Sequence, residues 1–268
     1  MTTPGDSNRP NGEYTGIIAD WYDDFLAGEG EDILLYTGLV LEDEGPALEL
    51  ACGTGRLMLP LLHEGMQVDG VDVSNDMLER CREKFEAEGV SAGLFHQSME
   101  DFETGRRYRT VFVSGGSFQL IPTLEGVRRA LETAYGHLMP NGRFILDLVV
   151  GPAPFGGTDP NSWQIGRIAS RGSERIVYSS RTVSDSFAQQ SQLLTRYEHF
   201  REGELIEIIT GELVLREYSR VEAELLLGEA GFAVERAEQR RIMSTHSVSV
   251  LFICRKPDST FIQEDLSP

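Results

Sequence analysis

Short apolar runs alternate with amphipathic stretches through the first half of the chain. Apolar side chains recur at helical spacing in residues 56–64, 74–88 and 124–138, which predicts three helices. Ser74 is a suitable N-cap for the second of these helices, and Gly89 is suited to end it. The apolar runs around them predict five strands, at residues 47–51, 68–73, 92–96, 110–114 and 143–150. This alternation indicates a parallel sheet with helices on both faces.

The pattern changes after Gly151, where a turn-rich stretch interrupts the alternation of strands and helices. Short runs of alternating polar and apolar side chains follow and predict an antiparallel β meander. These runs occupy residues 174–183, 192–200 and 204–215. The chain then returns to the first pattern. A helix is predicted over residues 219–230 and ends at Gly231, and the last two strands are predicted over residues 232–240 and 247–255.

These elements indicate an α/β fold class: a Rossmann-like three-layer sandwich on a mostly parallel seven-stranded sheet, with an N-terminal helical cap and an antiparallel β insertion. Residues 17–41 have helical spacing that breaks at Gly28 and Gly30, which predicts two helices in the cap. The polar ends, residues 1–12 and 257–268, are expected to be disordered. The expected domains are the leader and cap (1–45), the core (46–150), the insertion (151–218), the closing helix and strand pair (219–257) and the tail (258–268).

The charge balance limits the classes of partner. The chain has 24 basic and 43 acidic side chains, which give a formal net charge of −19. A surface this acidic repels nucleic acid, because DNA and RNA are bound through basic side chains that neutralise phosphates. No apolar run approaches the ~20 residues needed to cross a bilayer, so no membrane contact is expected. The expected partner is a small molecule, and the protein is expected to be a monomer or a homodimer.

The cysteines indicate the compartment. Cys52, Cys81 and Cys254 lack CxxC spacing and have no His cluster near them in the sequence. They therefore predict neither a metal site nor a disulfide framework, and a reducing cytoplasm is the expected location.

The segment Leu48–Arg56 (LELACGTGR) carries the main chemical signal. A strand enters a turn that opens a helix, and the glycines of this turn permit backbone angles and close approach that a Cβ would block. A dinucleotide site would need a third glycine where this chain has Met58. Asp72 ends the next strand about 20 residues beyond the turn, where a carboxylate can accept both hydroxyls of a ribose. Met77 follows one helical turn later, where it can pack on an adenine ring.

Three segments, ELACGTGR, VDGVDVSNDMLERCREKF and HLMPNGRFILDL, resemble the successive signature segments of class I S-adenosylmethionine-dependent methyltransferases. The resemblance covers residues 13–150 and implies S-adenosylmethionine as the cofactor. It implies that Glu49 lies beneath the methionine part of the cofactor. The third strand of that family usually ends in an Asp that contacts adenine, and this chain has Ser98 there, with Met99 or Glu100 as alternatives for the contact. The cofactor-binding residues that the resemblance implies are Tyr14, Tyr22, Glu49, Ala51, Gly53, Thr54, Gly55, Arg56, Asp72, Val73, Met77, Ser98, Met99 and Ser114.

The segment EYTGIIADWYD at residues 13–23 resembles the leader of the sugar-nucleotide amino-sugar N,N-dimethyltransferases, which also carry an antiparallel insertion after the fifth strand. The resemblance implies that Tyr14 lines the active site and that the leader folds over the cofactor. The active-site His of that family falls where this chain has Gln119, and a glutamine cannot act as a general base. If a base is needed, the candidates are His199, Tyr197 and His246. The candidates for substrate contact are Phe118, Gln119, Asp147, Trp163 and Tyr197.

Together these features predict methyl transfer to a small molecule of secondary metabolism, with an amine nitrogen as the nucleophile. A neutral amine needs no strong base, so Gln119 can serve as a hydrogen-bonding group that orients it. O- or C-methylation of a small metabolite is the alternative within the family. An NAD(P)-dependent oxidoreductase and a nucleoside-binding protein without catalytic activity are the alternatives outside it. No metal is expected, because displacement at a sulfonium carbon mainly requires alignment and exclusion of water.

Overall fold

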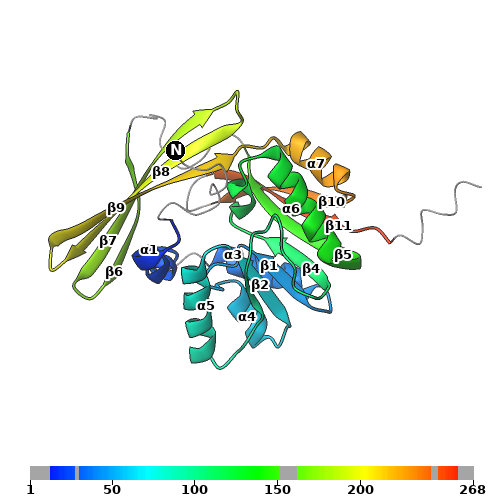
Figure 1. The fold of residues 1–268 in the computed structure, drawn as a ribbon, viewed down its shortest axis with the longest axis horizontal. Coiled ribbons are helices and arrows are strands. Elements are labelled where there is room, and N and C mark those ends of the chain that lie inside the picture. The colour runs from blue at the N-terminus through cyan, green and yellow to red at the C-terminus, as the bar shows by residue number, and fades with distance from the viewer. Residues whose placement is uncertain (1–12, 28–29, 151–161, 243–246, 259–268) are drawn as a thin grey trace, which may run out of the picture.

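The computed structural model describes residues 13–27, 30–150, 162–242 and 247–258, which form two sheets and the helices packed on them (Figure 1). The strands of the first sheet are β1 (Ala47–Leu50), β2 (Val68–Asp72), β3 (Leu94–His96), β4 (Tyr108–Val113), β5 (Leu138–Val149), β10 (Ala233–Ile242) and β11 (Ser247–Arg255). The strands of the second, the insertion sheet, are β6 (Gln164–Arg171), β7 (Glu174–Asp185), β8 (Gln190–Arg201) and β9 (Glu204–Arg216).

The first sheet has seven strands in the order β10-β11-β5-β4-β1-β2-β3. Neighbouring strands from β3 to β5 run parallel, and β11 runs antiparallel to both β5 and β10. The fold class predicted from the sequence is confirmed. Strand β5 begins at Leu138, earlier than the predicted start at residue 143, because pairing with β4 continues across a register shift beside Asn141, whose φ is 58°.

The core helices are α3 (Glu31–Leu41), α4 (Met58–His63), α5 (Asn75–Ala87), α6 (Leu124–His137) and α7 (Arg220–Glu229), with a short 3₁₀ helix η1 (Ser117–Leu120). Helices α3, α4 and α5 bury their apolar side chains against one face of the sheet, around Phe112 and Ile145. Helices α6 and α7 cover the other face, around Leu48 and Phe144. The Ser74 hydroxyl accepts a hydrogen bond from the N–H of Met77, which confirms the predicted N-cap. Among the described residues, none of the helices has the length and apolar character required to span a bilayer.

The insertion sheet contains one strand more than the sequence predicted. Strand β6 was missed because it is the edge strand of an antiparallel sheet whose order is β6-β7-β8-β9. Of its side chains only that of Ala169 is buried, so the strand lacks the alternation that marks a strand with one face in a core. The meander extends away from the first sheet at one end of the molecule (Figure 1).

The cap also differs from the prediction, since it contains three helices rather than two. The additional break divides α1 (Gly16–Asp20) from α2 (Tyr22–Phe25) at Trp21. Trp21 is buried among apolar side chains that include Ile176 and Tyr197 of the insertion sheet, and this packing turns the chain between the two short helices. Helix α1 lies between the insertion sheet and α5 (Figure 1).

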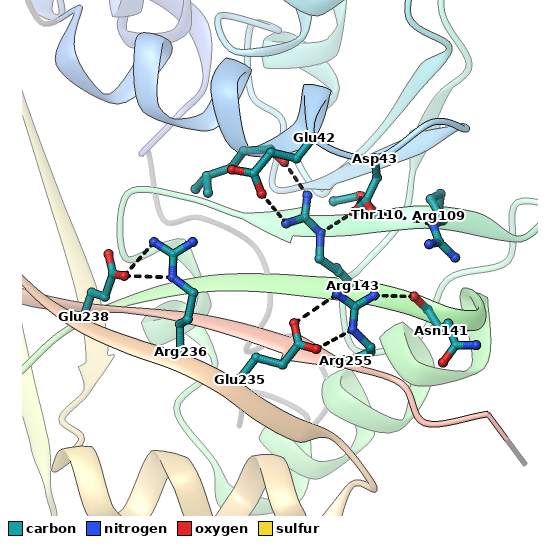
Figure 2. Close-up of polar contacts among 11 residues, drawn as sticks. Glu42, Asp43, Arg109, Thr110, Asn141, Arg143, Glu235, Arg236, Glu238 and Arg255 are labelled. Carbon is teal, nitrogen blue, oxygen red and sulfur yellow. Dashed lines mark hydrogen bonds and ion pairs between the residues drawn. The ribbon is translucent and has the colours of Figure 1, made fainter. Parts of the chain in front are cut away.

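Arg143 fixes the far end of α3 to the sheet. This buried side chain, near the start of β5, donates to Glu42 at 2.8 Å, to Asp43, and to the backbone oxygen of Leu39 (Figure 2). Beside it, Arg255 of β11 pairs with Glu235 of β10. The C-terminal end of α3 is held at the start of β5. The N-terminal half of α3 therefore lies toward the carboxyl ends of the parallel strands.

Candidate active site

The glycine turn after β1 adopts a backbone that few residues tolerate. Gly53 and Gly55 have φ values of 54° and 74°, and Ala51 also lies in the left-handed region at 54°. Gly55 packs directly against α5, because a Cβ there would lie 2.5 Å from Sγ of Cys81 and 2.7 Å from Cζ of Phe85. The requirement for glycine at position 55 is therefore one of packing as well as of backbone angle.

Asp72 organises this turn from the end of β2. Its Oδ2 accepts a hydrogen bond from the N–H of Gly53 at 2.7 Å, and its Oδ1 accepts one from the N–H of Ser74 at 2.8 Å. The side chain is buried, and burial raises the pKa of Asp72 although both N–H groups oppose the rise. Each carboxylate oxygen keeps a second lone pair, so Asp72 can accept further hydrogen bonds from a ligand.

A pocket opens at the ends of β1 and β2, beneath the first residues of the cap. Nine of its lining residues are among those that the sequence predicted for the cofactor: Tyr14, Tyr22, Ala51, Gly53, Asp72, Val73, Met77, Ser98 and Met99. Glu100, which the sequence analysis named as an alternative for the adenine contact, also lines the pocket. Six others were not predicted: Val71, Ser74, Gln97, Ser117, Leu120 and Ile121. The first three of these six adjoin predicted residues in the chain, whereas the others come from the loop after β4, whose path the sequence pattern does not define. The rings of Tyr14 and Tyr22 meet edge to face at 6.0 Å.

Five of the predicted cofactor residues, Glu49, Thr54, Gly55, Arg56 and Ser114, do not line this pocket. Thr54 donates to Asp23 of the cap at 2.6 Å, and Arg56 pairs with Asp32 of α3. Ser114 accepts a backbone hydrogen bond from Ser117 in the loop after β4. The structure thus gives Thr54 and Arg56 contacts that hold the cap and α3 to the glycine turn.

A second group of polar side chains is buried where α3 crosses the ends of the strands. Glu49, Asp147 and Ser249 each lie two residues from an apolar residue that packs on α3, so their side chains point to the face of the sheet that α3 covers. Tyr36 of α3 is buried against the same face of the sheet. We call these four residues the buried polar set. Oε2 of Glu49, the Tyr36 hydroxyl and Oγ of Ser249 have no hydrogen-bond partner within the part of the chain that the structure describes.

The electrostatics of the buried polar set disfavour negative charge. Burial raises the pKa of Glu49 well above its usual value, and the nearby Arg56 only partly opposes this. Burial also raises the pKa of Asp147, whose Oδ1 accepts from the N–H of Gly116 at 2.9 Å. Unsatisfied buried polar atoms are costly, so a ligand that supplied the missing hydrogen-bond partners would stabilise the buried polar set.

Comparison with known proteins identifies the core. Residues 47–142 match the family model described as a methyltransferase domain. A dTDP-3-amino-3,6-dideoxy-alpha-D-glucopyranose N,N-dimethyltransferase of Streptomyces fradiae is 30% identical over 145 residues, which are 52% of this chain and 55% of that enzyme. The chain thus matches about half the length of that relative. A dTDP-3-amino-3,4,6-trideoxy-alpha-D-glucopyranose N,N-dimethyltransferase of Streptomyces venezuelae is 25% identical over 82% of this chain and 92% of its own.

The fold comparison agrees with the sequence comparison. The crystal structure of a S-adenosylmethionine-dependent methyltransferase from Clostridium acetobutylicum superimposes with a TM-score of 0.72, at 17% identity, over 90% of this chain and 98% of that one. Residues 47–142 thus carry a methyltransferase domain, and the chain is similar to the S-adenosylmethionine-dependent methyltransferases over most of its length. The family predicted from the sequence motifs is confirmed, and S-adenosylmethionine is the cofactor of this family.

In this methyltransferase Gln119 is held at both ends by backbone groups. Its Nε2 donates to the backbone oxygen of Arg216 at 2.9 Å, and its Oε1 accepts from the N–H of Val149 at 2.8 Å. The side chain therefore joins the end of β5 to the end of β9, where the insertion begins and ends. The orienting role expected for Gln119 stays a prediction, and the neighbouring Phe118 is buried in the core on the α6 face.

Two of the remaining predicted residues, Tyr197 and His199, belong to strand β8 of the insertion sheet. His199 is buried, with Nε2 2.9 Å from a carboxylate oxygen of Glu174 and its ring beside Trp21. Tyr197 donates its hydroxyl to Glu13, a residue that the sequence analysis did not select. Trp163 is partly exposed, and the guanidinium groups of Arg181 and Arg196 lie over its ring. His246 lies outside the described residues. No role in catalysis is assigned to these residues by their contacts.

Within the described residues, no group of three or more His, Cys, Asp or Glu side chains is arranged to hold a metal ion. Cys52, Cys81 and Cys254 are buried and free. Burial raises the pKa of Cys81 and of Cys254 to about 12, so these thiols stay protonated at neutral pH.

Proposed function

We propose that this protein transfers a methyl group from S-adenosylmethionine to an amine nitrogen of a small molecule. The observation that carries the proposal is the Asp72 carboxylate, which faces a pocket at the strand ends while it holds the glycine turn. Pockets at the carboxyl ends of parallel strands are the usual place for ligands in open α/β sheets. The proposal assigns the cofactor and the acceptor to site residues that the sequence predicted.

The residues of the pocket fit the parts of S-adenosylmethionine. The free lone pairs of Asp72 can accept the ribose hydroxyls, and Met77, Ile121 and the ring of Tyr22 offer apolar surface for the adenosine group. Glu49 does not line the pocket but precedes the lining residue Ala51 by two positions, and its unpartnered Oε2 can accept a hydrogen bond from the ammonium of the methionine tail. A cation there would also lower the cost of a buried carboxylate, which burial alone makes high.

The acceptor is proposed to be an amine for two reasons. First, both relatives described above are named N,N-dimethyltransferases, and the longer match covers 92% of its relative. Second, Asp147 supplies a carboxylate that can receive the proton that the amine must lose, and the hydroxyl of Tyr36 can form a hydrogen bond with the amine. When bound, S-adenosylmethionine supplies a methyl group on a positively charged sulfur, which keeps the electron pair of the broken C–S bond.

The residues of this chain would act mainly by placement. The cap, through Tyr14 and Tyr22, covers the pocket and excludes water from it. Hydrogen bonds of Asp147 and Gln119 hold the loop after β4 to the end of β5, so the loop residues that line the pocket keep their position. Alignment and exclusion of water supply the main part of the rate enhancement for a displacement of this kind.

The proposed setting is the cytoplasm, and the proposed partner is a small molecule rather than nucleic acid. Three buried free cysteines are consistent with a reducing compartment. The formal net charge of −19 opposes binding of a polyanion.

Two measurements test the proposal. Calorimetry with S-adenosylhomocysteine should detect binding by the full-length protein, and absence of binding to this product and to S-adenosylmethionine would overturn it. Purified protein should then transfer labelled methyl groups to members of a panel of primary and secondary amines that includes amino sugars. Labelling confined to hydroxyl or carbon acceptors would select O- or C-methylation instead. Stabilisation by NADH alone would indicate an oxidoreductase. Binding of S-adenosylmethionine with no turnover of any acceptor would indicate a binding protein without catalytic activity.

A further inference from the structure

Glu13 is a carboxylate buried on the inner face of the insertion sheet, with 1% of its surface exposed. Both of its oxygens accept hydrogen bonds from β8: Oε2 from the hydroxyl of Tyr197 at 2.9 Å, and Oε1 from the hydroxyl of Thr195. Gly211 of β9 makes room for this carboxylate, because a Cβ at that position would collide with Oε1 of Glu13. Two strands of the insertion are thus shaped around one side chain from the start of the described chain.

The residues after Glu13 are attached to the other side of the pocket. The backbone oxygen of Tyr14 accepts a hydrogen bond from Oγ of Ser74 at 2.5 Å, and the N–H of Gly16 donates to Oδ2 of Asp76 at 2.6 Å. Both acceptor and donor side chains belong to the N-terminal turn of α5. Residues 13–16 therefore cross from the insertion sheet to the core, and the ring of Tyr14 lines the pocket between these two attachments.

Tyr14 has a φ of 60°, in the left-handed region. A side chain with a Cβ is disfavoured in that region, so this conformation persists only where the surroundings fix it on both sides. The contacts of Ser74 and Asp76 fix the residues that follow the Tyr14 ring, and the contacts of Glu13 fix the residue that precedes it. Without the anchor at Glu13, only one side of this backbone conformation is held.

The peptide bond between Glu13 and Tyr14 and a series of hydrogen bonds join the anchor to the glycine turn. Glu13 is followed by Tyr14, whose oxygen binds Ser74, and the N–H of Ser74 binds Asp72. Asp72 in turn binds the N–H of Gly53. The position of the insertion sheet and the geometry of the cofactor pocket are thus linked through contacts that involve no apolar packing.

We propose that Glu13 is a positioning residue, which holds Tyr14 over the cofactor pocket by anchoring the chain to β8 and β9. The inference rests on the proposed function, because it takes the pocket beside Tyr14 to be the cofactor site. Glu13 itself does not line the pocket, so it acts through Tyr14 and through the insertion sheet. Its loss allows the tyrosine to leave the pocket and weakens retention of the cofactor.

The test uses full-length variants. Glu13→Ala removes the anchor, and Glu13→Gln preserves its shape and one acceptor. Thr195→Val removes one donor, and Thr182→Val is the matched control, because Thr182 is also a buried threonine on the inner face and its hydroxyl has no partner among the described residues. Calorimetry measures the dissociation constant for S-adenosylhomocysteine, and scanning fluorimetry measures the melting temperature. Steady-state kinetics with an acceptor amine give kcat and the KM for S-adenosylmethionine.

Glu13→Ala and Thr195→Val should raise the dissociation constant and KM about tenfold, with kcat at saturating cofactor within about threefold of wild type. Glu13→Gln and Thr182→Val should bind like wild type. Loss of structure alone would lower the active fraction and leave KM unchanged. If Glu13→Ala does not fold, Tyr197→Phe serves in its place. Wild-type affinity in the anchor variants would overturn the inference, whereas absence of binding by the wild-type protein would overturn the proposed function.

Discussion

The carboxylate of Asp72 joins the N–H of Gly53 to the N–H of Ser74, with hydrogen bonds of 2.7 and 2.8 Å. One side chain at the end of β2 therefore sets both the glycine turn after β1 and the start of α5. Because α5 in turn holds Tyr14 through Ser74, the floor and the cover of the pocket depend on the same residue.

Replacing Asp72 with Ala should weaken binding of S-adenosylhomocysteine by about 30-fold or more, because two ribose hydroxyls and two backbone N–H groups lose an acceptor. Asp72→Asn keeps acceptor oxygen for one N–H group and should lie between Ala and wild type. Calorimetry measures the affinities. Glu83→Ala, on the exposed side of α5, is the control and should bind normally. Equal affinities for Asp72→Ala and wild type would remove Asp72 from the proposed cofactor site.

Gly55 and Gly65 provide a matched pair of substitutions. Both have positive φ, at 74° and 78°, but a Cβ at position 55 would meet Cys81 and Phe85, whereas nothing lies within 4 Å of one at position 65. Gly65→Ala should cost about 1 kcal/mol of unfolding free energy from backbone strain alone. Gly55→Ala should cost about 2–4 kcal/mol, because overpacking is added to that strain. Chemical denaturation measures both values, and equal losses would contradict the packing assigned to Gly55.

Glu49→Gln should make the free protein more stable. Burial raises the pKa of Glu49 above the value of 4.5 that applies in the unfolded chain. The folded state then binds the proton more tightly, so its stability falls as pH rises from about 4.5 through the raised pKa. At pH 8 the variant should exceed wild type by roughly 1–2 kcal/mol, and this advantage should vanish near pH 4.

The same variant should bind S-adenosylhomocysteine about tenfold more weakly, because the amide offers the ammonium no negative charge. Melting curves from pH 4 to 8 and calorimetry at pH 8 test the two halves of this prediction. A stability difference that does not change with pH would show that Glu49 is not protonated on folding.

The parts of the fold and site that depend on local pattern were predictable from the sequence. The strand before Gly53, the strand ending at Asp72 and the N-cap at Ser74 each leave a signal within a few residues. Strand β6 leaves none, because one buried side chain gives no alternation. Glu13 and Tyr36 owe their surroundings to residues far along the chain, since Glu13 contacts Tyr197 and Tyr36 packs on Phe112. Contacts of that kind follow from topology, which the local pattern does not contain.

Gln119→Ala distinguishes a structural from a catalytic role for this residue. The substitution leaves the N–H of Val149 and the oxygen of Arg216 without their partner, so it should cost about 2–4 kcal/mol of unfolding free energy. A residue that only oriented substrate would lower kcat and leave stability unchanged. Chemical denaturation and steady-state kinetics on the same preparation separate the two. Wild-type stability with a lowered kcat would indicate that Gln119 acts on the substrate in the active site.

Asp147→Asn tests the buried polar set as the place where the acceptor amine is held. Asparagine can still accept from the N–H of Gly116, so the loop after β4 should keep its position while the negative charge is lost. The variant should bind S-adenosylhomocysteine as wild type does, and kcat/KM for the amine should fall by about 10- to 100-fold. Asp69→Asn is the control, since Asp69 is another buried carboxylate, bound to Tyr108 at the opposite end of β2. Its kinetics should match wild type, and wild-type turnover by Asp147→Asn would place the acceptor elsewhere.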